Sequence, residues 1–275
     1  MIETFPKDSS FITRDLRQKR WAIPYSYDAL NGRVENLILN QRFAIQNKKI
    51  LDLGCHFGTF AYASLIHGAK FVQGIDSEVT LIKQAKDLFK EHHLEQKKYS
   101  FLKAELTTFL EKQNKNTFDT ILCLGIFYYL NDLVQTLRLM KKVAKKYIVL
   151  DTFTAYYGAT VAKERKKIAD YMKDESFELP LIIYPLTQAK KTDYTLTHHF
   201  KRKNKKSLSI LSLPTIPALE NFFRLLDLEA TLLSWKKYVV NNYSWKDFMG
   251  QEIKRKSHWA DVYHTKIRVS YLLKV

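Results

Sequence analysis

The stretch LDLGCHFG, residues 51–58, decides the fold of this chain, because it joins the end of an apolar strand to the start of a helix. Residues 49–53 predict a short buried strand, and residues 57–66 predict a helix that ends at Gly68, where glycine suits a left-handed cap. Gly54, at the end of the strand, lets the backbone turn tightly and approach a ligand without a Cβ in the way. The start of the helix offers unpaired N–H groups and a positive dipole end, which suit a carboxylate or a phosphate.

The same alternation of strand and helix continues downstream. Further strands are predicted at residues 71–75, 99–103, 118–124 and 147–151, and helices at residues 77–92, 106–112 and 133–144. Strands that alternate with helices at this spacing indicate βαβ units, a parallel sheet and right-handed crossovers. Asp76 closes the second strand, 24 positions after Asp52. An acid at that place can accept hydrogen bonds from both hydroxyls of a ribose.

The remaining segments extend this core at both ends. Residues 1–46 are interpreted as an N-terminal extension with a helix at residues 33–43, and residues 47–275 as one domain. Within that domain, residues 152–213 are interpreted as an insertion with a basic helix and a charge-repelling loop, placed at residues 161–172 and 201–206. A helix at residues 217–226 and strands at residues 229–235 and 264–274 complete the core. The expected fold is α/β: a doubly wound, Rossmann-like, seven-stranded and mostly parallel sheet with an N-terminal helical extension and an inserted cover region.

Composition narrows the class of protein and its partners. The chain has 275 residues and a net charge of +17, which favours encounters with polyanions such as RNA, although lysines from a biased genome would coat a surface in the same way. No apolar run approaches the roughly 20 residues that cross a bilayer, and the first residues lack a signal layout, so we expect a cytoplasmic protein without a transmembrane segment. Cys55 and Cys123 can supply neither a disulfide framework nor four zinc ligands, so buried thiols and no metal are expected.

Three stretches in order resemble the motifs of class I S-adenosylmethionine-dependent methyltransferases: residues 51–58, Gly74-Ile75-Asp76, and FDTILCLGIFYYL at residues 118–130. The resemblance covers roughly residues 49–151, with weaker similarity at residues 214–235 and in the final strand. It implies S-adenosyl-L-methionine as the cofactor. The cofactor-binding residues that it implies are Asp52, Gly54, Cys55, His56 and Gly58 around the methionine part, Asp76 at the ribose, Glu105 near the adenine edge, and Leu124 and Gly125 at the sulfonium.

The same resemblance makes Tyr128 and Tyr129 the candidate catalytic residues, facing the acceptor. Their aromatic faces would favour the cation of the donor by about 0.5–2 kcal/mol. The sequence departs from the family at His56, where many members carry glycine or another small residue, and at Tyr129, where the most similar relatives carry histidine. An acceptor that must lose a proton would need a general base, for which His56, His198, His199 and Asp151 are candidates.

The acceptor is left open by the motifs. The leading expectation is transfer of a methyl group to an oxygen or nitrogen of a small molecule. A weaker likeness to tRNA wobble-uridine carboxymethyl-transferring enzymes, in residues 68–76, 125–128 and 214–226, makes RNA modification the alternative, with either the ordinary or a carboxylated donor. A positive track of Lys163, Arg165, Lys166, Lys201 and Arg202 would favour RNA. A third reading is a non-catalytic binding protein that retains the fold.

Overall fold

The computed structural model describes residues 2–13, 26–160, 170–188, 199–202, 205–249 and 257–275, and residues 186–188, 199–202 and 205–209 through their backbone alone. Within this part of the chain no helix is long and apolar enough to cross a membrane. Lys163, Arg165, Lys166 and His198 lie outside the described residues, as does most of the helix expected at residues 161–172.

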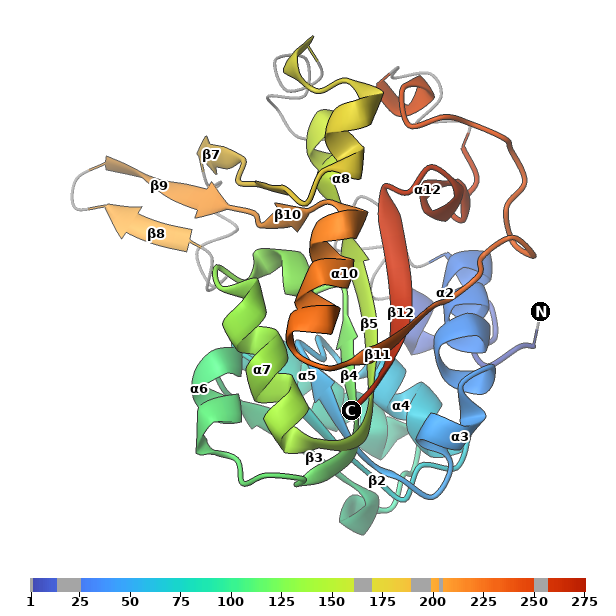
Figure 1. Ribbon diagram of the computed structural model, residues 1–275. Coiled ribbons are helices and arrows are strands. Elements are labelled where there is room, and N and C mark those ends of the chain that lie inside the picture. Colours follow the sequence, from blue (N-terminus) through green and yellow to red (C-terminus); the bar gives the residue numbers. More distant parts are fainter. Residues whose placement is uncertain (1, 14–25, 161–169, 189–198, 203–204, 250–256) are drawn as a thin grey trace. The chain divides into compact units, whose positions relative to one another are not determined.

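Seven strands of the described residues form the main sheet, in the order β11-β12-β5-β4-β1-β2-β3 (Figure 1). Their bounds are β1 Lys49–Leu53, β2 Phe71–Asp76, β3 Tyr99–Lys103, β4 Phe118–Leu124, β5 Ala144–Phe153, β11 Glu229–Leu232 and β12 Arg268–Lys274. Strand β2 pairs in parallel with β1 and β3, and β11 pairs antiparallel with β12. The expected seven-stranded, mostly parallel Rossmann-like sheet is therefore confirmed.

Helices connect these strands where the apolar periodicity predicts them. Their bounds are α4 Thr59–Ile66, α5 Val79–Glu91, α6 Leu106–Lys112, α7 Leu133–Val143 and α10 Ile216–Leu225. Helix α12 Asp261–His264 was not predicted, and the strand expected at residues 264–274 begins only at Arg268. Helix α5 buries one face that includes Leu81, Leu88 and Phe89 and leaves lysines on the other, as an amphipathic helix does. The sequence predicts Ser77 as its N-cap, whereas the N-cap is Glu78, one residue later, and the Asp76 carboxylate accepts a hydrogen bond from the Glu78 N–H.

The chain divides into two compact units, which are described separately. Unit 1 comprises Met1–Leu122 and Val143–Val149, and unit 2 comprises Cys123–Lys142 and Leu150–Val275. The N-terminal helices of unit 1 are α2 Tyr27–Val34, the π-helix η1 Glu35–Leu39 and α3 Arg42–Ile45, in place of one helix at residues 33–43. The Asn31 side chain accepts hydrogen bonds from the N–H groups of Thr4 and Phe5, which ties the first residues to α2.

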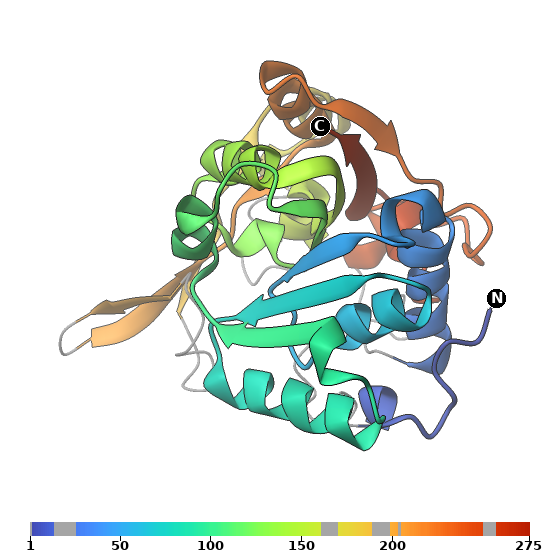
Figure 2. The same cartoon turned by 90° about the horizontal axis from the view of Figure 1, so that it is seen from below.

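Unit 2 contains the segment at residues 152–213 that the sequence analysis interprets as an insertion. It contains α8 Ala155–Thr160, the 3₁₀-helix η4 Asp174–Glu178, β6 Ile182–Ile183, β7 Leu186–Gln188, β8 His199–Arg202, β9 Lys205–Ile210 and β10 Leu213–Pro214. These described strands form two small sheets, β10-β6 and β7-β9-β8. The hairpin β8–β9 extends away from the other elements of unit 2 in both views (Figures 1 and 2). The loop expected at residues 201–206 is therefore wrong at positions 201–202 and 205–206, which pair as strands.

Candidate functional site

The loop between β1 and α4, residues 54–58, has a backbone that few side chains permit. Gly54, His56 and Gly58 have φ values of 63°, 53° and 84°, all in the left-handed region that favours glycine. The Cys55 N–H donates to the Ile75 carbonyl over 2.9 Å, and the Gly58 N–H donates to the Cys55 carbonyl over 2.8 Å. The loop therefore turns tightly against the end of β2 before α4 begins.

Asp76 fixes this loop from the end of β2. Its Oδ2 accepts the N–H of His56 at 3.0 Å, and its Oδ1 accepts the N–H of Glu78 at 2.9 Å. Both contacts use backbone donors, so the acid is oriented by the main chain of its own sheet edge. The structure thus brings together Gly54, His56, Gly58 and Asp76, the residues that the sequence placed around the methionine and the ribose.

Two glycines of this region have no room for a side chain. A Cβ on Gly74 would lie 2.6 Å from the Phe101 ring and 2.9 Å from Cys55 Sγ. A Cβ on Gly58 would lie 2.9 Å from the rings of Phe101 and Phe89. Phe101, in β3, is therefore the side chain against which the loop and β2 pack. Sequence reasoning did not single it out, because nothing local marks which strand residue a distant loop will touch.

Asp52 lies at the end of β1 with only 3% of its surface exposed. Burial raises the pKa of its carboxyl to about 8, against a hydrogen bond from the Ala61 backbone, and the charge of Asp76 adds to the rise. Its Oδ2 is buried without a hydrogen-bond partner among the described residues, and so is Oγ1 of Thr59, the first residue of α4. An orphaned buried polar atom costs about 1–3 kcal/mol. Two of them at the ends of this loop fit a ligand that brings its own donor groups, such as an ammonium.

The other predicted cofactor residues of unit 1 have defined structural partners. Cys55 is buried, and burial raises the pKa of its thiol well above the ordinary value, so it stays protonated. The His56 ring packs 4.3 Å from the ring of Phe57. Glu105 caps α6: its carboxylate accepts the N–H groups of Thr107 at 3.1 Å and Thr108 at 2.7 Å. Burial opposes ionisation of Glu105, but these hydrogen bonds outweigh it and lower its pKa. A contact of Glu105 with adenine stays a prediction.

In unit 2, Leu124 is the last residue of β4 and Gly125 follows it. Leu124 is 8% exposed. Gly125 has φ 81°, and its N–H donates to the Asp151 carbonyl at 2.8 Å. A Cβ on Gly125 would lie 3.0 Å from a terminal guanidinium nitrogen of Arg268. Glycine at this position therefore lets a buried cation approach the main chain.

The tyrosines predicted to face the acceptor lie in an aromatic cluster of unit 2. Tyr128 is 4% exposed, and its ring centroid lies 4.4 Å from that of Tyr129 and 4.8 Å from that of Phe153. Phe153 in turn stacks on Tyr157 at 4.1 Å. Burial raises the pKa of Tyr128 well above 10, although the charge of Arg268 opposes the rise. Near neutral pH this hydroxyl is a hydrogen-bond donor and not a base, and a catalytic role for Tyr128 and Tyr129 stays a prediction.

A buried ion pair lies beside this cluster. The Asp151 carboxylate, fully buried, accepts hydrogen bonds from Nε of Arg268, from the Ser270 hydroxyl at 2.6 Å and from the Tyr263 hydroxyl at 3.0 Å. Arg268 also pairs with Asp151 through a terminal nitrogen, and its guanidinium lies 4.8 Å over the Phe153 ring. Three donors hold Asp151 as a carboxylate, so it is a poor candidate for a general base. Sequence reasoning missed Arg268, because Ser270 and Lys274 are also polar residues of this strand and no local pattern singles out Arg268.

Known proteins resemble this chain at several levels. Residues 45–211, more than half of the chain, match the family model described as a methyltransferase domain. The tRNA U34 carboxymethyltransferase of Helicobacter acinonychis (strain Sheeba) is 29% identical over 136 residues, a match that covers 49% of this chain and 51% of the relative. The chain thus spans about half the length of the curated relatives it matches.

Solved structures agree with the fold. A methyltransferase dependent on S-adenosylmethionine from Mesorhizobium loti superposes with a TM-score of 0.53 at 16% identity, covering 90% of this chain and all of that one. Magnesium protoporphyrin IX methyltransferase from Synechocystis PCC 6803, solved with bound S-adenosylhomocysteine, superposes with a TM-score of 0.51 at 12% identity, covering 96% and 87%.

Proposed function

Because this chain belongs to the methyltransferase domain family and has the fold of enzymes that depend on S-adenosylmethionine, we propose that it alkylates tRNA. The proposal assigns the donor to unit 1, at the loop of residues 54–58. The observation that carries it is the buried Oδ2 of Asp52 beside that loop, for which the described residues supply no hydrogen-bond partner. Family membership favours an enzyme over the non-catalytic protein of the third reading.

The residues of unit 1 divide the binding of the donor among them. Asp52 would accept from the ammonium of the methionine part, and the start of α4, where Gly58 provides no side-chain cap, suits its carboxylate. Asp76, already oriented by His56 and Glu78, would accept from the ribose hydroxyls. When bound, the donor supplies an electrophilic carbon on a sulfonium. The protein needs to align the acceptor with that carbon, which can contribute about 7–11 kcal/mol, and no nucleophilic side chain is required.

The carboxylated form of the donor is supported by Arg268. Within unit 2, the Arg268 guanidinium lies beside Gly125 and over the Phe153 ring, and it is paired with Asp151. Arginine carries five N–H donors, of which the bonds to Asp151 use two. Tyr128, neutral and buried near the same cation, offers a hydroxyl donor. A cation and a hydroxyl together suit a carboxylate, and the curated relatives are named for carboxymethyl transfer.

RNA is supported as the acceptor by two observations. The relative from Helicobacter acinonychis is named for position U34 of tRNA. The net charge of +17 favours a polyanionic substrate. The small-molecule acceptor that leads the expectations from sequence stays a prediction, and the experiment below includes it as an outcome.

The test is a transfer assay with two donors and two acceptor pools. Purified protein is incubated with ordinary or carboxylated S-adenosylmethionine and with either bulk tRNA or a metabolite extract, and products are identified by mass spectrometry of nucleosides and metabolites. We expect the carboxymethyl mass increase on a tRNA nucleoside, with Arg268→Lys reducing the preference for the carboxylated donor. Transfer to metabolites alone would overturn the RNA assignment, and methyl transfer of equal efficiency would overturn the role of Arg268.

A further inference from the structure

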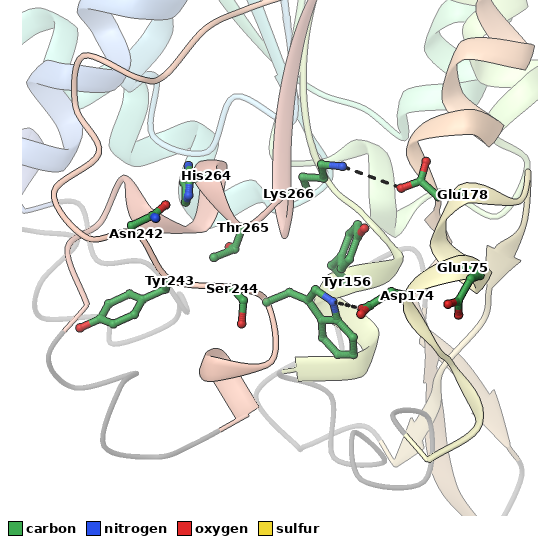
Figure 3. A pocket seen from close by; sticks show the side chains of 11 residues that line it. Tyr156, Asp174, Glu175, Glu178, Asn242, Tyr243, Ser244, His264, Thr265 and Lys266 are labelled. Carbon is green, nitrogen blue, oxygen red and sulfur yellow. Dashed lines mark hydrogen bonds and ion pairs between the residues drawn. The ribbon is translucent and has the colours of Figure 1, made fainter.

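A hollow of about 580 Å³ lies in unit 2, apart from the Tyr128 cluster (Figure 3). Its walls come from α8, from η4, from residues 242–245 and from residues 264–266. Figure 3 shows Asn242 and His264 on one side of the hollow, with Tyr156, Asp174 and Glu178 on the other. No role in binding the donor falls on these residues.

One wall of the hollow is aromatic and firmly packed. The Tyr156 ring stacks on that of Phe177, with centroids 4.0 Å apart and planes 9° from parallel. The Trp245 ring contacts both, at 5.0 Å from Phe177 and 5.8 Å from Tyr156. Trp245 and Tyr243 are partly exposed at the hollow, so each presents ring surface that a flat ligand can cover.

The polar groups of the same wall are acceptors held in place. Asp174 accepts Nε1 of Trp245 at 2.9 Å and Nζ of Lys246 at 2.7 Å. Nζ of Lys266 lies 3.9 Å from Glu178. Burial raises the pKa of Tyr156 to about 12, and the charges of Glu178 and Asp174 add to that rise. The hollow is therefore lined by three carboxylates, those of Asp174, Glu175 and Glu178, of which the first and the last are paired with lysines.

These features select a class of ligand. A phosphate placed inside the hollow would be repelled by the carboxylates, so the group that enters must be uncharged or positive, with any phosphate left outside. Within the described part of the chain, no three His, Cys, Asp or Glu residues lie together as a metal site requires. A flat ring with amino groups fits, because aromatic faces stack on it and carboxylates accept from exocyclic amines, while Lys266 and Asn242 can donate to ring carbonyls. Nucleobases combine these features, and single-stranded RNA presents them unstacked.

We propose that this hollow, the base pocket, binds an unstacked nucleobase of the RNA that the enzyme alkylates. The inference rests on the proposed tRNA acceptor and adds the second point at which that RNA is held. Helix α8 connects the two points: Tyr156 lines the base pocket, and Tyr157, the next residue, stacks on Phe153 beside Tyr128. A nucleotide in the base pocket is thus a near neighbour, along the RNA, of the nucleotide held at Tyr128.

The test is a coupling measurement between protein and RNA. The RNA is a stem–loop with a seven-nucleotide single-stranded loop, prepared intact and with an abasic nucleotide at each loop position in turn. Affinities are measured for the wild type and for Trp245→Leu and Glu178→Gln. The controls are Trp245→Phe, which keeps a stacking ring, and Tyr171→Leu, which removes an exposed ring of unit 2 outside the hollow.

We expect Trp245→Leu to weaken binding of the intact stem–loop about tenfold. One abasic position should cause the same loss, and the two losses should not add when combined. Trp245→Phe and Tyr171→Leu should bind as the wild type does. Unchanged affinity of Trp245→Leu, or losses that add at every loop position, overturns the base pocket. If Trp245→Leu melts at a lower temperature than the wild type, Glu178→Gln is read by the same criteria.

Transfer is measured separately on the wild type, so that the two proposals can fail independently. Transfer to tRNA without coupling between Trp245 and a loop nucleotide overturns the base pocket alone. Coupling without transfer to tRNA overturns the proposed function and leaves the RNA-binding surface in place.

Discussion

The substitution Asp52→Asn separates what the β1 end contributes to folding from what it contributes to binding. Asp52 is 3% exposed, and one of its oxygens has no hydrogen-bond partner in the part of the chain that the structure describes. Asparagine has nearly the same shape as the protonated acid, but it does not titrate. The variant therefore removes the cost of burying or protonating this carboxyl and keeps the packing.

The size of the effect follows from the pKa. The carboxyl titrates near 3.8 in the unfolded chain and near 8 in the folded protein. Because the folded pKa is the higher one, the wild type has its full stability below pH 3.8 and loses it as the pH rises towards 8. Each pH unit in this window costs about 1.4 kcal/mol. Relative to the wild type, Asp52→Asn should gain about 3 kcal/mol of unfolding free energy between pH 5 and pH 7.

Urea denaturation of both proteins at several pH values between 5 and 8 measures this difference. Titration of all other groups is shared by the two proteins, so their difference isolates Asp52. A difference in unfolding free energy that stays constant from pH 5 to pH 7 would refute the raised pKa. A difference that falls with pH would show that the carboxyl is stabilised as a charge in the folded protein.

The same variant should bind S-adenosylhomocysteine about tenfold more weakly, because a charged acceptor is replaced by a neutral one. Binding to the wild type at pH 7 should release a proton, since an ammonium favours the ionised acid. Calorimetry in two buffers of different ionisation enthalpy detects that proton. Asp52→Asn should release none, and equal release from both proteins would remove Asp52 from the site.

Three further substitutions test other parts of the structure. Asp76→Ala should weaken binding of S-adenosylhomocysteine by about 1–3 kcal/mol in calorimetry, because it loses an oriented charged acceptor, and unchanged affinity would exclude Asp76 from the site. Gly74→Ala should lower the unfolding free energy, measured by urea denaturation, by about 1–3 kcal/mol, because its Cβ would meet the Phe101 ring at 2.6 Å. Adding Phe101→Leu to the same chain should recover part of that loss. If the losses of the two single variants simply add in the double variant, the contact is contradicted. Replacing four basic residues of the β8–β9 hairpin with glutamine should lower the magnitude of the slope of log affinity for tRNA against log salt concentration by about 3. Replacing four exposed lysines of unit 1 with glutamine is the control and should leave that slope unchanged. Equal effects of the two sets would exclude the hairpin from contact with phosphate. The hairpin positions are Lys201, Arg202, Lys205 and Lys206, and the control positions are Lys83, Lys86, Lys90 and Lys112.

The parts of the fold that the sequence predicts are those with local causes. A glycine after an apolar strand, as at Gly54, and an acid after the next one, as at Asp76, follow from turn geometry and strand length, and both lie where expected. The start of α5 was misplaced because two neighbouring polar residues, Asp76 and Ser77, could each receive the first N–H. The hairpin at β8–β9 was predicted as a loop because its charges are local, whereas its pairing with β7 is not.

The contacts that the sequence does not reveal join distant residues. Asp151 lies 117 positions before Arg268, and no local pattern pairs them. Alternation in the last strand places Arg268 and Ser270 on one face, which is consistent with both reaching the same carboxylate, but the acid itself lies in another strand. Phe101 is similar: its packing against Gly74 follows from the parallel register of β2 and β3, which only the assembled sheet defines.

Two of the buried acids among the described residues, Asp151 and Asp52, differ in a way that bears on which one serves a ligand. Asp151 receives donors from Arg268, Ser270 and Tyr263, so its charge is compensated within the protein and its removal would leave a buried cation unpaired. Among the described residues, Asp52 has an oxygen without a hydrogen-bond partner and a carboxyl whose burial opposes its charge, so the folded protein is less stable for keeping it. A residue that destabilises the free protein at neutral pH gives no advantage to folding there. Under the proposed function its advantage comes from the bound state, in which a cation held by the loop of residues 54–58 compensates its charge.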